Sequence, residues 1–452
     1  MKSINPANNQ TIQEYREHTS GEVVEIINKS HHEWLAWKES PFSLRGERMM
    51  KAASLLRKRK DELAMLMTLE MGKIIRESEA EVEKCAWGCE YYAENAERFL
   101  QDEVIPSDAS RSFVAFQPLG VVLAVMPWNF PLWQVFRFAA PTLMAGNGGL
   151  LKHASNVPGC ALIIEEIFRE AGFPADLFRT LMIPSGMVET VIDHPAIAAV
   201  TLTGSEYAGS QVAAAAGQRI KKTLLELGGS DPFIILEDCN LEMAVQHAVN
   251  SRMINQGQSC IAAKRFIVHE LVLETFTNRI QQALTGLKAG DPLDPATDIG
   301  PLARPDLVDD IDRQVQESVQ MGATLITGGA RYDREGCYYQ PTILTNVKAG
   351  MPAYSEETFG PLVAIIPVAT DEEAVRVSND SVFGLGGSVW TNDIERGEQI
   401  ARRVESGAVF VNGMTKSDPR LPFGGIKQSG YGRELGINGI REFVNIKTIW
   451  IR

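Results

Sequence analysis

The first hundred residues have the hydrophobic spacing of helices. Between residues 21 and 100 apolar side chains recur every three or four positions, at Met50, Ala53, Leu56, Leu63, Leu66 and Met67. This period places them on one face of a helix, and charged residues occupy the opposite face. Gly72 predicts the end of one helix, and a second helix is expected over residues 77–99.

Residues 121–227 instead alternate short apolar runs with helical stretches. Strands are expected at 121–126, 149–153, 178–183, 198–202 and 223–227, and helices at 132–145 and 159–171. This order is typical of a parallel α/β sheet, in which ligands bind at the carboxyl ends of the strands. Asn129, Lys152 and Ser205 fall at the ends of three of these strands.

A second α/β pattern follows the glycine pair Gly228-Gly229, which predicts a domain boundary. Its strands are expected at 233–236, 265–268, 324–326 and 362–366, and its helices at 241–250, 274–283 and 305–321. No repeat or long linker separates the two patterns. A chain of 452 residues is also too long for one ordinary core. We therefore expect an α/β fold with closely packed domains.

Two further segments alternate polar and apolar residues as edge strands do. They are residues 112–116, which follow a turn near 105–108, and residues 443–451 at the C-terminal end. These segments can pair within one chain or across a dimer. They therefore form either a surface hairpin or an arm that reaches another subunit.

Composition indicates a globular protein and excludes some partners. Hydrophobic residues make up 44% of the chain and charged residues 22%, as in ordinary globular proteins. The 44 basic and 57 acidic side chains leave a net charge of −13, which opposes broad attraction to nucleic acid or to anionic lipid. A small anionic ligand would need a local basic pocket.

The N-terminus and the cysteines favour the cytoplasm. The first residues lack the apolar core of a signal peptide, and the most apolar stretch, 120–138, is interrupted by Pro127 and Pro131. The six cysteines are scattered, as expected in a reducing compartment. Cys85 and Cys89 lie one helical turn apart without neighbouring ligands, so we interpret them as core residues rather than a metal site.

One cysteine and two carboxylates are the candidate chemistry. Cys260 ends a polar pentapeptide at 256–260, Glu226 lies in LELGG at 225–229, and Glu357 lies in EETFGP at 356–361. A cysteine attacks as a thiolate, which requires partial exposure and a nearby base or positive charge. The pentapeptide alone fits a buried structural cysteine better, and its companion motifs are what favour a nucleophile.

A phosphate site is the second candidate. The GxGxxG fingerprint of dinucleotide-binding proteins is absent, but Gly204 and Ser205 open a predicted helix. The N-terminus of a helix with small residues can hold a phosphate. A simple helix cap at Ser205 explains the same residues about as well.

Seven motifs together resemble the aldehyde dehydrogenase family over nearly the whole chain. They are PWNFP at 127–131, KHAS at 152–155, TGS at 203–205, LELGG at 225–229, GQSC at 257–260, EETFGP at 356–361 and PFGGIKQSG at 422–430. The phrases LKHASNVPG, LELGGSDPFI and AAKRFIV are most similar to the shorter bacterial succinate-semialdehyde dehydrogenases.

The resemblance implies two Rossmann-like domains with parallel sheets and a small β arm. Residues 1–103 and 120–228 would bind NAD(P), and residues 229–421 would form the catalytic domain. Residues 104–119 and 437–452 would bridge the subunits of a homodimer or homotetramer.

The resemblance also implies roles for single residues. Cys260 matches the nucleophile, Asn129 the oxyanion donor, and Glu226 the base that activates water to hydrolyse a thioester. The cofactor contacts match Trp128, Lys152, Ser155, Gly204, Ser205, Leu227, Glu357 and Phe359. Members that pass the acyl group to coenzyme A generally lack the glutamate, so Glu226 favours release of a free acid.

Departures from the family pattern bear on cofactor and substrate. Many NAD-specific members carry a glutamate at position 155, whereas Ser155 is neutral, so NADP is expected to be accepted, alone or alongside NAD. Arg137 matches one of two arginines that bind the substrate carboxylate in succinate-semialdehyde dehydrogenases, and Ile254 replaces the other. Arg420 and Lys416 are candidate substitutes, although a basic residue at a pocket rim is more often simply solvated.

The resemblance therefore predicts NAD(P)-dependent oxidation of succinate semialdehyde to succinate. The alternatives are oxidation of another short aldehyde, such as glutarate semialdehyde, or a non-catalytic structural or binding relative. Retention of both Cys260 and Glu226 disfavours the non-catalytic alternative. Ala262 replaces the second cysteine of a redox-sensitive pair, so local disulfide control is not expected.

Overall fold

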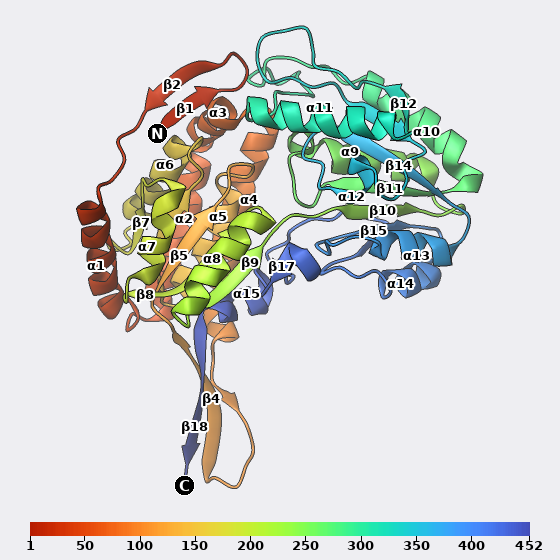
Figure 1. Ribbon diagram of the computed structural model, residues 1–452. Coiled ribbons are helices and arrows are strands. Elements are labelled where there is room, and N and C mark those ends of the chain that lie inside the picture. Colours follow the sequence, from red (N-terminus) through yellow and green to blue (C-terminus); the bar gives the residue numbers. More distant parts are fainter.

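The computed structural model describes residues 1–452 and contains two lobes, each built around a sheet (Figure 1). The N-terminal half of the chain forms one lobe, and residues from 231 onward form most of the other. A narrow β ribbon, which contains the C-terminal strand, projects below the first lobe in Figure 1.

The N-terminal segment is helical, as the hydrophobic spacing predicts. Its helices are α1 (Ser20–Trp37), α2 (Phe42–Lys58), α3 (Lys60–Met71) and α4 (Ile75–Phe99). Gly72 caps α3 in the left-handed conformation, with a φ of 81°. The sequence pattern did not predict the antiparallel hairpin of β1 (Lys2–Asn5) and β2 (Gln10–Glu14) that precedes these helices.

The first lobe contains a six-stranded sheet in the order β17-β9-β8-β5-β6-β7. Its elements are β5 (Val121–Met126), α5 (Trp133–Met144), β6 (Gly148–His153), α6 (Pro158–Glu170), β7 (Phe178–Thr180), η1 (Ser185–Met187), α7 (Val188–Asp193), β8 (Ile197–Thr203), α8 (Glu206–Gln218) and β9 (Lys222–Glu226). All five predicted strands are present and parallel, although β7 ends three residues earlier than predicted. The short β17 (Gly430–Tyr431) returns from the C-terminal region and joins β9 in antiparallel orientation.

The second lobe contains a seven-stranded sheet in the order β12-β13-β14-β11-β10-β15-β16. Its elements are β10 (Asp231–Ile235), α9 (Leu241–Met253), η2 (Ile254–Gly257), β11 (Ala263–His269), α10 (Glu270–Thr285), α11 (Pro305–Gln320), β12 (Thr324–Thr327), β13 (Thr342–Thr345), α12 (Pro352–Ser355), β14 (Leu362–Val368), α13 (Asp371–Asn379), β15 (Ser388–Trp390), α14 (Ile394–Ala401) and β16 (Phe410–Val411). Only β12 runs antiparallel to its neighbour. The predicted α/β class is confirmed, with mixed rather than purely parallel sheets.

The two predicted edge strands, at residues 112–116 and 443–451, pair with each other within one chain. The arm is a three-stranded antiparallel sheet of β3 (Glu103–Val104), β4 (Arg111–Pro118) and β18 (Val444–Ile451), and β18 follows η3 (Lys427–Ser429) and α15 (Gly436–Glu442). Its pairing runs from Val444 opposite Pro118 to Ile451 opposite Arg111. The predicted domain boundaries stay a prediction.

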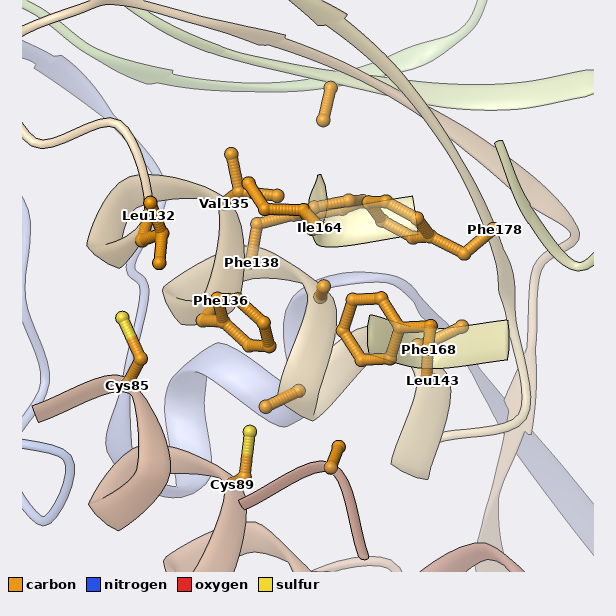
Figure 2. Close-up of a cluster of buried hydrophobic side chains, with 14 of the residues drawn as sticks. Cys85, Cys89, Leu132, Val135, Phe136, Phe138, Leu143, Ile164, Phe168 and Phe178 are labelled. Atoms are coloured by element: carbon orange, nitrogen blue, oxygen red, sulfur yellow. The ribbon is translucent and has the colours of Figure 1, made fainter. Parts of the chain in front are cut away.

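A dense core of aromatic residues fixes α5 against the first sheet (Figure 2). Phe168 of α6 lies 5.2 Å from Phe136 of α5 and 4.8 Å from Phe178 of β7, measured between ring centroids. Cys85 and Cys89 of α4 are fully buried in the same cluster. Every residue of α5 is buried, so this helix is a rigid support for the side chains that it presents to the cavity described below.

None of the helices combines the length and the apolar character that a bilayer-spanning segment requires.

Candidate active site

A cavity of about 190 Å³ lies where the carboxyl ends of the first sheet face the second lobe. The strands β5, β8 and β9 end at this cavity, as expected for a ligand site in a parallel sheet. Its lining residues are Pro127, Trp128, Asn129, Gln134, Thr203, Gly204, Ser205, Leu227, Gly228, Cys260, Glu357 and Phe359. Eight of the thirteen predicted site residues therefore lie around one space.

The loop before Cys260 has an unusual backbone. Asn255 and Gln256 adopt the left-handed region, with φ values of 49° and 56°, and Gly257 follows with 81°. Such conformations cost free energy for residues other than glycine and persist only where the surroundings impose them. A β-carbon at Gly257 would collide with the carbonyl oxygen of Gly360, so this position requires glycine.

Buried hydrogen bonds hold that loop against the first lobe. The Asn255 side-chain amide donates to the backbone oxygens of Asn129, at 2.7 Å, and Gln258, at 3.2 Å. Lys264 is almost completely buried, and its Nζ donates to the backbone oxygens of Ser259, at 2.8 Å, and Cys260, at 2.7 Å. These contacts fix the position of the cysteine from both sides.

The Asn129 side chain is oriented before any substrate arrives. Its Nδ2 donates to the backbone oxygen of Gln258 at 3.1 Å, and its Oδ1 accepts from Nε2 of Gln134 at 3.0 Å. The side-chain amide has two N–H donors, so one remains for another acceptor. Asn129 is buried beside the cavity that holds Cys260, as an oxyanion donor must be.

The Cys260 thiol is a weak acid in this setting. Burial raises its pKa to about 12, while the positive charges of Lys264 and Arg137 act in the opposite direction. The thiol is therefore mostly protonated at neutral pH. Its thiolate fraction rises as the pH increases toward that pKa.

Glu226 lies at the end of β9 and does not itself line the cavity, although Leu227 and Gly228 directly after it do. Its carboxylate is buried, and neither oxygen has a hydrogen-bond partner in the protein. Burial raises the pKa of Glu226 well above its usual range, and the carboxylate of Glu434 adds to the shift. A carboxylate of this kind is a stronger base than usual once it is ionised.

The predicted cofactor contacts lie on the first-sheet side of the cavity. Ser205 caps α8, its Oγ accepting from the backbone N–H of Ala208 at 3.3 Å. The rings of Trp128 and Phe359 meet edge to face, with centroids 6.0 Å apart. Glu357 accepts from the backbone N–H of Gly229 at 2.8 Å.

A second cavity of about 350 Å³ lies beyond the ends of β6 and β7. It is lined by Met1, Lys2, Glu17, Lys152, Ser155, Asn156, Pro184 and Ser185. Strands β8, β5 and β6 are neighbours in the sheet and run parallel, so the two cavities lie along the same carboxyl edge. A dinucleotide needs such an extended path, and the ammonium of Lys152 with the hydroxyls of Ser155 and Ser185 suits a phosphate at its far end.

The two predicted substrate arginines lie outside the cavity lining. Arg137 is buried, forms an ion pair with Glu434, and stacks over the ring of Phe423 at 4.8 Å. Arg420 is largely exposed and forms an ion pair with Asp418 at 2.7 Å. Their roles as substrate ligands stay predictions.

Sequence reasoning missed several residues of the site. Gln134 and Thr203 line the cavity, and Lys264 and Glu434 act on the reactive groups next to it. Lys264 offered a signal, because a lysine at the start of a predicted buried strand rarely lacks a partner. Glu434 offered none, since its charge meets Glu226 only after β17 returns to the first sheet.

Comparison with known proteins matches residues 1–449 to the model of the aldehyde dehydrogenase family. A probable succinate-semialdehyde dehydrogenase (NADP+) of Synechocystis sp. is 55% identical over 451 residues, which cover 100% of this chain and 99% of that protein. Succinate-semialdehyde dehydrogenase (NADP+) 1 of Mycobacterium tuberculosis is 48% identical over 456 residues, with the same coverage.

Solved structures give the same result. The crystal structure of succinic semialdehyde dehydrogenase from Streptococcus pyogenes, in complex with NADP+, superposes with a TM-score of 0.98 at 37% identity. The match covers 100% of this chain and 99% of that one.

Alkylation tests the state of the nucleophile. Without added cofactor, iodoacetamide should label Cys260 slowly at pH 7, and the rate should rise about tenfold per pH unit up to pH 10, because only the thiolate reacts. Peptide mass spectrometry measures the rate at each cysteine. Cys239, whose pKa burial raises to about 11, is the internal control and should follow a parallel slope. A rate at Cys260 that is already constant between pH 6 and 8 would contradict the prediction.

Proposed function

The chain belongs to the aldehyde dehydrogenase family, and we propose that it oxidises succinate semialdehyde to succinate with NADP+ as the oxidant. The observation that carries this proposal is the meeting of Cys260 and Asn129 at one cavity, with Glu226 directly behind its wall. The relatives named for this reaction are similar over the full length, which supports the same substrate. The presence of all three catalytic residues disfavours a purely structural role.

The first step is attack of the Cys260 sulfur on the aldehyde carbon. A carbon–sulfur bond forms, the carbonyl π bond breaks, and the oxygen becomes negatively charged. The free N–H of the Asn129 amide and the backbone N–H of Cys260 would stabilise that oxygen, and one such donor typically contributes about 3 kcal/mol. The positive charges of Lys264 and Arg137 favour the thiolate that attacks.

A bound NADP+ would supply the hydride acceptor that oxidation of the thiohemiacetal on Cys260 requires, and the product of that oxidation is a thioester on Cys260. Trp128, Phe359 and Leu227 would hold the nicotinamide end, because they wall the cavity beside the sulfur. Gly204 and Ser205 would hold the pyrophosphate at the N-terminus of α8.

Glu226 would complete the cycle by taking a proton from water. The water oxygen attacks the thioester carbon, the carbon–sulfur bond breaks and the carboxylic acid leaves. The proton held by Glu226 then passes to the sulfur, which restores the thiol. Leu227 and Gly228, directly after Glu226, line the cavity, so the chain brings this carboxylate next to the site. Neither oxygen of Glu226 has a hydrogen-bond partner in the protein, so both are available to accept a proton from water.

The second cavity supports NADP+ as the cofactor. Lys152 donates to Ser185 at 3.4 Å and forms no ion pair, so its charge is available to a 2′-phosphate. Ser155 adds a hydroxyl donor and no negative charge. Glu17 is the acidic residue of this lining, and its carboxylate lies 3.5 Å from the N-terminal ammonium.

The arm supports assembly into a homodimer or homotetramer. Its strand β18 exposes Ile446, Trp450 and Ile451, which lie on a sheet edge that no other strand covers. Exposed apolar residues on an edge strand favour association with another chain. We infer that the enzyme works in the cytoplasm, where a reducing environment would keep the nucleophile free.

The substrate assignment can be tested with purified protein and a panel of aldehydes. With NADP+, absorbance of the reduced cofactor should give a higher kcat/KM for succinate semialdehyde than for butanal, its neutral four-carbon analogue, and than for glutarate semialdehyde. Cys260→Ala is the control and should abolish the signal. Equal values for the charged and neutral four-carbon aldehydes would overturn the assignment.

Glu226→Gln should separate oxidation from hydrolysis. The variant should release one reduced cofactor per active site in a rapid burst, after which steady turnover falls by about 10²- to 10⁴-fold, because the thioester lacks its base. Rapid-mixing absorbance measures both phases, and Cys260→Ala should show neither. Normal steady turnover in Glu226→Gln would exclude the proposed base.

Ser155→Glu should reverse the cofactor preference. A carboxylate beside the 2′-phosphate should lower kcat/KM for NADP+ by about 100-fold, since opposed like charges cost several kcal/mol, and should leave the value for NAD+ within about threefold. Ser155→Gln is a neutral control of the same size, and both of its values should stay near wild type. A parallel loss with both cofactors would show that position 155 does not contact the phosphate.

A further inference from the structure

We propose that Glu77, near the start of helix α4, is a positioning residue for the reaction, because it holds the loop of Cys260 against the oxyanion donor Asn129. The inference rests on the proposed function in one respect, the attack of Cys260 on an aldehyde. Glu77 lines neither of the two cavities. Any effect of this residue on turnover must therefore pass through the backbone that it contacts.

The contact between Glu77 and the loop is a single hydrogen bond. Its Oε2 accepts from the backbone N–H of Asn255 at 2.9 Å. Asn255 is completely buried and is one of the two residues that hold the loop in a left-handed backbone conformation. A buried N–H that loses its acceptor destabilises the conformation that buries it. Glu77 therefore supports the loop at a point where the backbone is strained.

The next turn of the same helix holds the segment that follows Asn129. Oε1 of Glu81 accepts from the backbone N–H groups of Leu132 and Trp133, each at 2.9 Å, where α5 begins. Glu77 and Glu81 are four residues apart, so both carboxylates lie on the same face of α4. One face of a single helix thus contacts both of the segments that meet at the cavity.

These contacts form a closed ring. The Asn255 side-chain amide donates to the backbone oxygen of Asn129 at 2.7 Å, and the Asn129 amide donates to the backbone oxygen of Gln258 at 3.1 Å. The ring therefore runs from α4 through Asn255 to Asn129, and back through the start of α5 to α4. Gln258 lies two residues before Cys260, so the ring includes the backbone on which the nucleophile stands. Supporting hydrogen bonds of this kind fix the separation of reactive groups.

Charge balance does not account for Glu77. The ammonium of Lys73 is completely buried and pairs with Glu81, which leaves Glu77 as a second carboxylate without an ion pair of its own. Burial raises the pKa of Glu77 to about 7, while the charge of Lys73 and the hydrogen bond from Asn255 act in the opposite direction. The bond to the loop is thus one of the few contacts that favour an ionised Glu77.

Glu77→Ala tests the proposal. The loop should lose its acceptor and shift, and kcat should fall by about 10- to 100-fold, since a displacement of about 1 Å in a reaction centre can cost about 100-fold. KM for NADP+ should stay within about twofold, which also shows that the variant folds. Succinate semialdehyde and butanal should lose kcat alike, because Glu77 positions the reacting centre and not the far end of the substrate. Initial rates of cofactor reduction measure these constants.

Two further variants separate the hydrogen bond from a general effect of the substitution. Glu77→Gln keeps an acceptor oxygen and should recover most of the lost kcat, with a remaining deficit because a neutral acceptor binds an N–H more weakly. Glu79→Ala is the matched control, since it removes the same charge from the same helix but lies two positions away, on a different face. It should leave kcat unchanged. Equal losses in Glu77→Ala and Glu77→Gln, or no loss in either, would overturn the role of Glu77.

An Asn129→Ala background tests whether Glu77 acts through the oxyanion donor. Loss of that donor should itself lower kcat by about 10²- to 10³-fold. Adding Glu77→Ala should then lower kcat by less than about threefold, because no donor remains to be positioned and coupled residues are not additive. A full further loss would contradict the positioning role. A wild-type protein that oxidises neither aldehyde would contradict the proposed function itself, whereas an active wild type with a fully active Glu77→Ala variant would contradict only the role of Glu77.

Discussion

The site depends on a strained loop that buried polar contacts hold in place. Asn255 and Gln256 adopt left-handed backbone conformations that a free chain would rarely populate. The compensation comes from Asn255, whose amide bonds to the backbone of Asn129 in the other lobe, and from Lys264, whose ammonium binds the carbonyl of Cys260. The same bonds that relieve the strain join the oxyanion donor to the nucleophile. Their separation is therefore set by the fold and does not depend on the substrate.

Burial raises the pKa of both reactive groups, Cys260 and Glu226, but the consequences for their reactivity are opposite. It raises the pKa of the Cys260 thiol, which makes the nucleophile scarce, and it raises the pKa of Glu226, which makes the base strong. The positive charge of Arg137 lowers both pKa values and so opposes both shifts. Glu434 limits this effect by pairing with Arg137. The protonation of the two reactive groups thus depends on four residues that are far apart in sequence.

Much of the architecture could be predicted from the sequence, and the failures have physical reasons. Apolar runs long enough to be buried on both faces, such as β5 and β8, were placed within one residue at each end. Strands of two to four residues, such as β13 and β16, are too short to show a period and depend on pairing with distant partners. Eight of the site residues predicted from the motifs, Cys260 among them, line one cavity. Glu434 carried no local signal, because tertiary packing alone brings it next to Glu226.

Helix α5 sets the geometry of the cavity wall beside Asn129. Its twelve residues are all buried, so its register cannot shift without disrupting the aromatic core around Phe168. Nε2 of Gln134 on this helix donates to Oδ1 of Asn129, while Nε1 of Trp133, the residue before it, donates to Oγ of Ser417. Because a rigid helix holds the Gln134 side chain against Asn129, the orientation of the oxyanion donor is fixed by the backbone.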